Sequence, residues 1–159
     1  DKEHNFLLQI HGRKTVYVWE PNDLVVADDR ARDRFHASGQ RDLIVWDEAF
    51  RRRAHRFEIG PGEGAYMPST SPHLVEVGDE PSVTVSFTYY TANTRRDALL
   101  RKARGRLFEY GVHLPPVGKR TWLDQMLQSG AAAAQSLKNT MSHLRGKPTW
   151  SDGATYATR

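Results

Sequence analysis

The sequence predicts a mainly β fold, a small β-barrel, followed by a helical module. Up to about residue 92 the chain consists of short runs rich in β-branched and aromatic residues, and turns with glycine or proline separate them. Beyond that point apolar residues recur at helical spacing. We therefore expect the C-terminal part of a barrel domain over residues 1–92, a helical C-terminal module over residues 93–146 and a loose tail over residues 147–159.

Seven strands are expected in the first region. The pair Gly12–Arg13 is a hairpin signal, and glycine-rich turns follow at Gly60–Gly64 and Gly78–Pro81. Residues 28–38 are charged and weakly helical, and residues 47–54 fit a single helical turn. The expected strands comprise two within residues 5–19 and one each at residues 43–46, 56–59, 65–67, 74–77 and 82–90.

Two helices are expected in the second region. Thr94 with Asp97 fits a capping box at the start of the first helix, which Gly111 ends. Thr121 with Asp124 fits a second capping box, and the apolar residues after it continue at helical spacing.

The composition limits the partners and the metals that this chain can bind. No apolar run approaches the roughly 18 residues of a membrane span, so we expect no membrane partner. The formal charge of +4 permits nucleic acid as a partner, but the basic residues are scattered and do not favour it. The absence of cysteine fits a cytoplasmic protein and leaves histidine and carboxylates as metal ligands, a set that suits Fe(II), Mn(II) or Zn(II).

The segment from Gly62 to Tyr90 has the pattern of a metal-binding strand. A glycine turn, a strand and a loop beginning at Pro68 precede His73, which starts the next strand. A sheet holds such a histidine with little freedom, so its imidazole is well placed to bind a metal. This layout resembles the second motif of the cupins. The alternative is a histidine with a purely structural role in the sheet.

The opening segment, Asp1 to Trp19, carries a second pattern. Asp1 is followed by Asn5–Phe6, Gln9–Ile10, Gly12 and Lys14. In order and spacing these residues resemble the JmjC and cupin-8 family of Fe(II)- and 2-oxoglutarate-dependent oxygenases, and also bacterial cupin-like proteins that are labelled transcriptional regulators. The resemblance covers roughly residues 1–90, is closest at its two ends, and implies a double-stranded β-helix, the cupin or jelly-roll barrel.

The resemblance also implies a set of site residues. Asp1 and His73 would be two ligands of a 2-His-1-carboxylate triad, and the first histidine would lie two residues before Asp1, outside this chain. Lys14 would meet the far carboxylate of 2-oxoglutarate, and Asn5 would hydrogen-bond this co-substrate. Ser86 stands where the hydroxylases of the family have an asparagine, so it departs from the pattern while keeping a hydrogen-bonding group.

Each of these assignments has an alternative. Asp1 could be an unstructured end, Lys14 a surface lysine beside the hairpin, and Asn5 part of a turn network. The alternation of side chains along an extended strand favours the site residues that the resemblance implies, because it places Asp1, Asn5 and Gln9 on one face.

The expected function is an Fe(II)- and 2-oxoglutarate-dependent oxygenase that hydroxylates a peptide side chain or a small metabolite. Two alternatives stay open: a non-catalytic cupin regulator that binds a metal or a small ligand, and a metal-dependent enzyme, such as an isomerase, that uses no 2-oxoglutarate. The resemblance also implies a homodimer that forms through the C-terminal helices.

Overall fold

The computed structural model describes residues 2–40 and 43–145, and the chain divides into two compact units. Unit 1 comprises Asp1–Arg32 with Arg41–Tyr89, and unit 2 comprises Asp33–Gln40 with Tyr90–Arg159. No helix in the described ranges has both the length and the apolar character that crossing a membrane requires.

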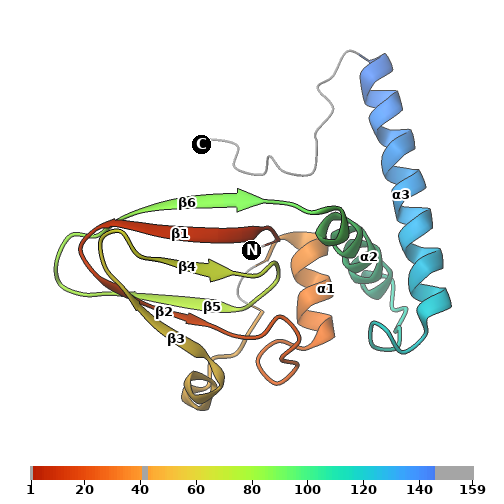
Figure 1. Ribbon diagram of the computed structural model, residues 1–159. Coiled ribbons are helices and arrows are strands. Elements are labelled where there is room, and N and C mark those ends of the chain that lie inside the picture. Colours follow the sequence, from red (N-terminus) through yellow and green to blue (C-terminus); the bar gives the residue numbers. More distant parts are fainter. Residues whose placement is uncertain (1, 41–42, 146–159) are drawn as a thin grey trace. The chain divides into compact units, whose positions relative to one another are not determined.

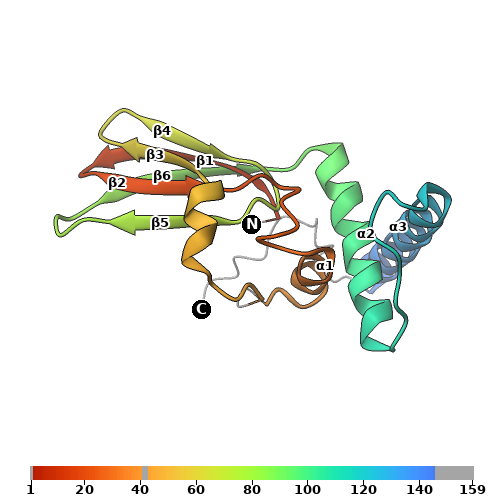
Figure 2. The ribbon, with the colours of Figure 1, turned by 90° about the horizontal axis from the view of Figure 1, so that it is seen from below.

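Unit 1 contains two antiparallel sheets of three strands each (Figures 1 and 2). One sheet has the order β4-β1-β6 and the other has the order β3-β2-β5. The strands are β1 (His4–His11), β2 (Lys14–Val18), β3 (His55–Ile59), β4 (Gly64–Met67), β5 (His73–Val77) and β6 (Val83–Tyr89). Six of the seven expected strands therefore form close to their predicted positions.

The predicted double-stranded β-helix is wrong for this structure. The strands form two separate small sheets, no barrel closes among the described residues, and 41% of those residues are helical against 24% in strands. A closed barrel requires every strand to have a neighbour on both sides. Here only β1 and β2 are paired on both sides, so each sheet keeps two edge strands.

The expected strand at residues 43–46 is also wrong. This run leads instead into the short 3₁₀ helix η1 (Glu48–Arg53), which Asp47 caps by accepting a hydrogen bond from the backbone N–H of Ala49 at 2.8 Å. The Trp46 ring packs edge-on against Trp19, with 6.0 Å between the ring centroids. Of this run, Trp46 therefore packs on the residue that follows β2, whereas Val45 is 90% exposed.

Strand β2 is the centre of unit 1 because it packs on both faces. Val16 and Val18 lie in a core between the two sheets, together with Ile59, Ala65 and Met67. Side chains alternate along a strand, so the neighbouring residues project to the other side. There they form a second cluster that contains Tyr17, Trp19 and Val26, with Phe50, Ala54 and Leu74 packed against it.

Helices α1 (Asp29–Ser38), α2 (Ala92–Glu109) and α3 (Thr121–Leu144) form in or near the regions where helices were expected. The capping box of α2 differs from the predicted one: the Thr91 hydroxyl accepts from the Thr94 N–H at 3.2 Å, and the Thr91 N–H donates to the Thr94 hydroxyl at 2.9 Å. Asp97 instead pairs with Arg101 one turn later. The expected box at the start of α3 is also wrong, because Arg120 is its N-cap and has no side-chain cap bond.

Unit 2 is stabilised by a buried ion-pair cluster. The Asp33 carboxylate accepts from Arg104 at 2.9 Å and from Arg101 at 3.2 Å, and all three side chains are less than 10% exposed. Gly105 allows this part of α1 to approach α2, since a Cβ there would lie 2.3 Å from the Asp33 carbonyl oxygen.

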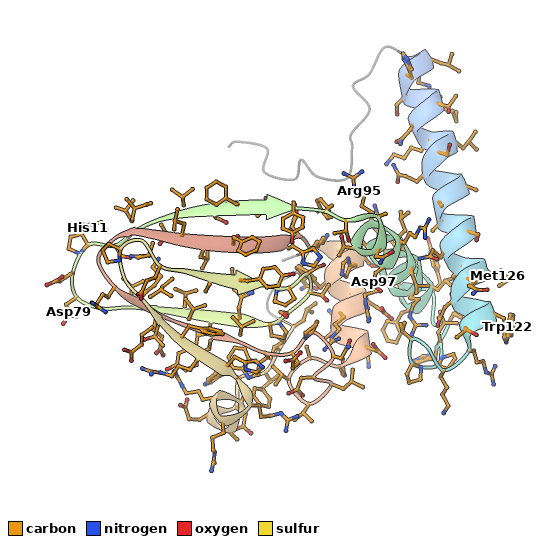
Figure 3. The ribbon with its side chains drawn as sticks, in the orientation of Figure 1. His11, Asp79, Arg95, Asp97, Trp122 and Met126 are labelled. Atoms are coloured by element: carbon orange, nitrogen blue, oxygen red, sulfur yellow. The ribbon has the colours of Figure 1, made fainter. Side chains whose placement is uncertain are left out.

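Helix α3 contacts α2 but has no buried residue. Two of its large apolar side chains, Trp122 and Met126, project from α3 on the side away from α2 (Figure 3).

Candidate functional site

The inner face of sheet β4-β1-β6, which faces the other sheet, is largely polar on β1 and β6, whereas β4 contributes the buried Ala65 and Met67. Asn5 and Gln9 project to the same side of β1 as Leu7, which packs against the core between the sheets. Their side chains are 5% and 0% exposed. On β6, Thr84 lies opposite Gln9 and Ser86 lies opposite Leu7, so these two hydroxyls share the same side. We call Asn5, Gln9, Thr84 and Ser86 the polar inner face.

Hydrogen bonds connect the members of the polar inner face in pairs. The Ser86 hydroxyl donates to Asn5 Oδ1 at 2.7 Å, and the Thr84 hydroxyl donates to Gln9 Oε1 at 2.7 Å. Ser86 is exposed although its position faces inward, so the polar inner face is open to solvent at β6. Ser86 is therefore accessible from solvent, whereas Asn5 and Gln9 are buried.

Lys14 brings a positive charge to the polar inner face from the other sheet. It is the first residue of β2 and projects to the same side as Val16, toward the space between the sheets. Its ammonium group donates a hydrogen bond to the Thr84 hydroxyl. Within residues 2–40 and 43–145, no carboxylate forms an ion pair with Lys14. This charge is suited to an anionic ligand.

His73 begins β5 and lies opposite Val18, on the inward side of its sheet. Its Nδ1 is 3.1 Å from the carbonyl oxygen of Ser71. A carbonyl oxygen only accepts hydrogen bonds, so Nδ1 carries a hydrogen, and in the neutral imidazole the lone pair is then on Nε2. This arrangement is typical of histidines that bind a metal through Nε2.

The structure describes four of the five predicted site residues. Asn5, Lys14, His73 and Ser86 all lie on inward positions of unit 1, and Asn5 and Ser86 contact each other directly. Asp1 lies outside the described residues. No group of three or more histidine and carboxylate side chains that could hold a metal ion is present among the residues that the structure describes.

Sequence reasoning missed Thr84. It neither belongs to the opening segment nor fits the histidine pattern, but it bonds to both Gln9 and Lys14. The available signal was alternation along β6, where Thr84 and Ser86 are polar and Val83, Val85 and Phe87 are apolar.

A hollow of about 320 Å³ is lined by Arg13, Lys14, Glu58 and Glu76, and the two carboxylates lie on the outer face of sheet β3-β2-β5. Both carboxylates already have partners: Glu76 accepts from Arg51 at 2.6 Å, which lowers the pKa of Glu76, and Glu58 accepts from Arg56 at 2.5 Å. The positive charges of Arg13 and Lys14 are thus not offset by these two acids.

The outer face of sheet β4-β1-β6 is apolar and carries the aromatic residues. Phe6 packs on Tyr66 with 4.8 Å between ring centroids, and His4 stacks on Tyr89 at 5.0 Å. The Tyr66 hydroxyl lies 2.6 Å from His4 Nδ1, and burial together with the hydrogen bond to Tyr89 raises the pKa of Tyr66. Tyr66 therefore points away from Lys14 and the polar inner face.

No protein-family model matches this chain, and no curated protein sequence matches it significantly. The resemblance of the opening segment to the oxygenases stays a prediction.

Proposed function

We propose that this protein is an Fe(II)- and 2-oxoglutarate-dependent oxygenase that binds its co-substrate on the polar inner face and hydroxylates a peptide side chain or a small metabolite. The observation that supports the proposal best is the Lys14 ammonium, which donates a hydrogen bond to Thr84 of the polar inner face. Asn5, Ser86 and His73 also occupy inward positions of unit 1.

The chemistry of these residues fits a dicarboxylic co-substrate. An ammonium group that has no carboxylate partner in the described chain gains a charge-assisted hydrogen bond when a ligand carboxylate arrives. Such a bond contributes about 1.5–3 kcal/mol. Asn5 and Ser86 supply an amide and a hydroxyl with which to orient the bound molecule.

The metal end of the proposed site has one described ligand, His73, whose bond to Ser71 orients its ring. Asp1, outside the described residues, would add a carboxylate, and imidazole with carboxylate suits Fe(II). Iron with the co-substrate would supply the activation of oxygen. The residues of this chain would bind and orient the co-substrate.

The test is an anaerobic titration with Fe(II) and 2-oxoglutarate that follows the visible charge-transfer band. We expect a saturable band that His73→Ala abolishes. Lys14→Ala should raise the apparent Kd for 2-oxoglutarate roughly 10- to 150-fold, the equivalent of one charge-assisted bond. Lys102→Ala, which removes the same charge from an exposed position of α2, is the matched control and should leave the Kd unchanged.

The opposite results separate the alternatives. The absence of a band overturns the oxygenase proposal. A band without succinate formation in air, with any of a panel of peptides and metabolites, favours the non-catalytic regulator.

We also propose that the protein forms a homodimer through α3. The supporting observation is a row of exposed apolar side chains along this helix: Trp122, Met126, Leu137, Met141 and Leu144. Light scattering should give twice the chain mass of 18.1 kDa. Leu137→Lys should halve the measured mass, whereas Gln125→Lys, at another exposed position of α3, should not. A monomeric mass for the unaltered protein at micromolar concentration overturns the dimer.

A further inference from the structure

We infer that Gln9 and Thr84 are positioning residues that hold the Lys14 ammonium where it binds the far carboxylate of the co-substrate. The inference rests on the proposed function and adds to it two residues that do not contact the ligand themselves. Its basis is a continuous relay of hydrogen bonds from Gln9 through Thr84 to Lys14.

The direction of each bond in the relay is fixed by chemistry. The Gln9 amide nitrogen lies 2.5 Å from the carbonyl oxygen of His11 and 3.1 Å from that of Gly12, and carbonyls only accept. The other amide atom, Oε1, therefore faces Thr84 and accepts its single hydroxyl hydrogen at 2.7 Å. This leaves only lone pairs on the Thr84 oxygen for Lys14, whose ammonium can only donate.

Gln9 is a rigid anchor for this relay. It is completely buried, and its amide nitrogen also lies 2.8 Å from the Ser82 hydroxyl oxygen, so its two hydrogens are shared among three acceptors. These bonds fix the corner at which the chain leaves β1 for β2. The corner is tight, because a Cβ on Gly12 (φ +72°) would lie 2.4 Å from the carbonyl oxygen of Pro81.

Lys14 follows this corner after one further residue, so the corner and the relay together fix both ends of its long side chain. The ammonium has three hydrogens and gives one to Thr84. The other two are left to meet a carboxylate in a defined direction. A lysine side chain without this restraint would lose its rotamer freedom only when the ligand binds, which weakens binding.

The first experiment compares two ligands in the Fe(II)-loaded protein under anaerobic conditions. Thr84→Val keeps the shape of the side chain and removes the hydroxyl. We expect it to raise the Kd for 2-oxoglutarate roughly ten-fold, the equivalent of one ordinary hydrogen bond, and to leave the Kd for pyruvate unchanged. Pyruvate is the probe because it has the 2-oxo acid end and lacks the far carboxylate. Thr84→Ser should restore the original value.

A double-mutant cycle tests whether Thr84 acts through Lys14. If it does, the protein with both Lys14→Ala and Thr84→Val binds 2-oxoglutarate no more weakly than the protein with Lys14→Ala alone. If Thr84→Val instead disturbs the structure, it weakens 2-oxoglutarate binding further in the protein that already has Lys14→Ala.

A second measurement needs neither metal nor co-substrate. The rate of acetylation of Lys14 by acetic anhydride, measured by mass spectrometry against exposed Lys102 in the same sample, reports how firmly the ammonium is held. Thr84→Val should raise the rate ratio several-fold, and Thr84→Ser should not.

These outcomes distinguish the inference from the function on which it rests. Equal losses for both ligands, additive losses in the cycle, or an unchanged acetylation ratio overturn the positioning role even though the unaltered protein binds 2-oxoglutarate. If the unaltered protein binds neither 2-oxo acid, the proposed function fails and the positioning role fails with it.

Discussion

The two sheets of unit 1 differ in how they distribute their polar and apolar side chains. In sheet β3-β2-β5 the inner face carries Val16 and Val18, and the outer face carries both the second apolar cluster and charged residues such as Glu76. In sheet β4-β1-β6 most inner residues of β1 and β6 are polar, whereas Phe6 and Phe87 on the outer face are 46% and 55% exposed.

An antiparallel sheet normally buries its apolar face, so sheet β4-β1-β6 departs from the usual arrangement. Burying polar groups such as Gln9 costs free energy unless every group is hydrogen-bonded. The relay to Thr84 and Lys14 meets that requirement. The difference teaches that one sheet stabilises unit 1 by packing, while the other keeps polar groups at the position where we propose the co-substrate binds.

The largest expected effect is on the polar side of this comparison. Gln9→Ala removes one side chain but leaves two hydroxyls and two carbonyls with fewer partners, so we expect a loss of about 3 kcal/mol in the free energy of unfolding. Urea denaturation measures it, and Gln125→Ala, at an exposed position of α3, is the control. A loss below about 1 kcal/mol would contradict the role of Gln9 as the anchor of the hydrogen bonds to Ser82 and Thr84.

The next effect concerns the apolar side. Val16→Thr keeps the volume of a completely buried side chain and adds a hydroxyl to the core between the sheets. We expect a loss of about 1–3 kcal/mol on unfolding in urea, because that hydroxyl enters apolar surroundings. The reverse exchange at the preceding residue, Thr15→Val, is on the outer face and should change the free energy of unfolding by less than about 0.5 kcal/mol. Equal changes in the free energy of unfolding at the two positions would contradict the assignment of Val16 to a buried face and Thr15 to the outer face.

A smaller and pH-dependent effect is expected on the outer side of sheet β3-β2-β5. Asp23 accepts from Arg53 at 2.7 Å, which lowers the pKa of Asp23 below its usual value near 3.8. The stabilisation is therefore present above that usual value and is lost as the pH falls through the lower folded-state pKa. Asp23→Asn should cost about 1 kcal/mol at pH 7.

Unfolding curves of the Asp23→Asn protein and the unaltered protein should converge as the pH falls below about 3.8. A difference that persists undiminished at lower pH would show that the Asp23 side chain stabilises unit 1 for a reason other than its charge.

The smallest effect is expected on the bare outer face of sheet β4-β1-β6. Phe87→Thr replaces an exposed ring by a residue that also favours strands, so the free energy of unfolding should change by less than about 0.5 kcal/mol. A loss above about 1.5 kcal/mol would show that Phe87 packs against another surface in solution. Repeating the measurement at several protein concentrations would identify a second copy as that surface.

Local patterns were sufficient for most elements of this protein. Alternating apolar residues located β5 and β6, and helical spacing located α2 and α3. The patterns failed where an apolar residue had a different use, as with Trp46, which packs on Trp19 instead of pairing in a sheet. They also failed at the start of α2, where Thr91 is the N-cap and Thr94 is the N3 residue of the same capping box.

The sequence by itself determined which side chains share a face. Asn5 and Gln9 project from the same side of one strand because side chains alternate, and Lys14 follows a glycine turn. Only the tertiary structure decided that the chain forms two open sheets and that Thr84, 70 positions after Lys14, meets its ammonium. The physical reason is that the pairing of β1 with β6 and the packing of one sheet on the other are long-range choices, and no local spacing specifies them.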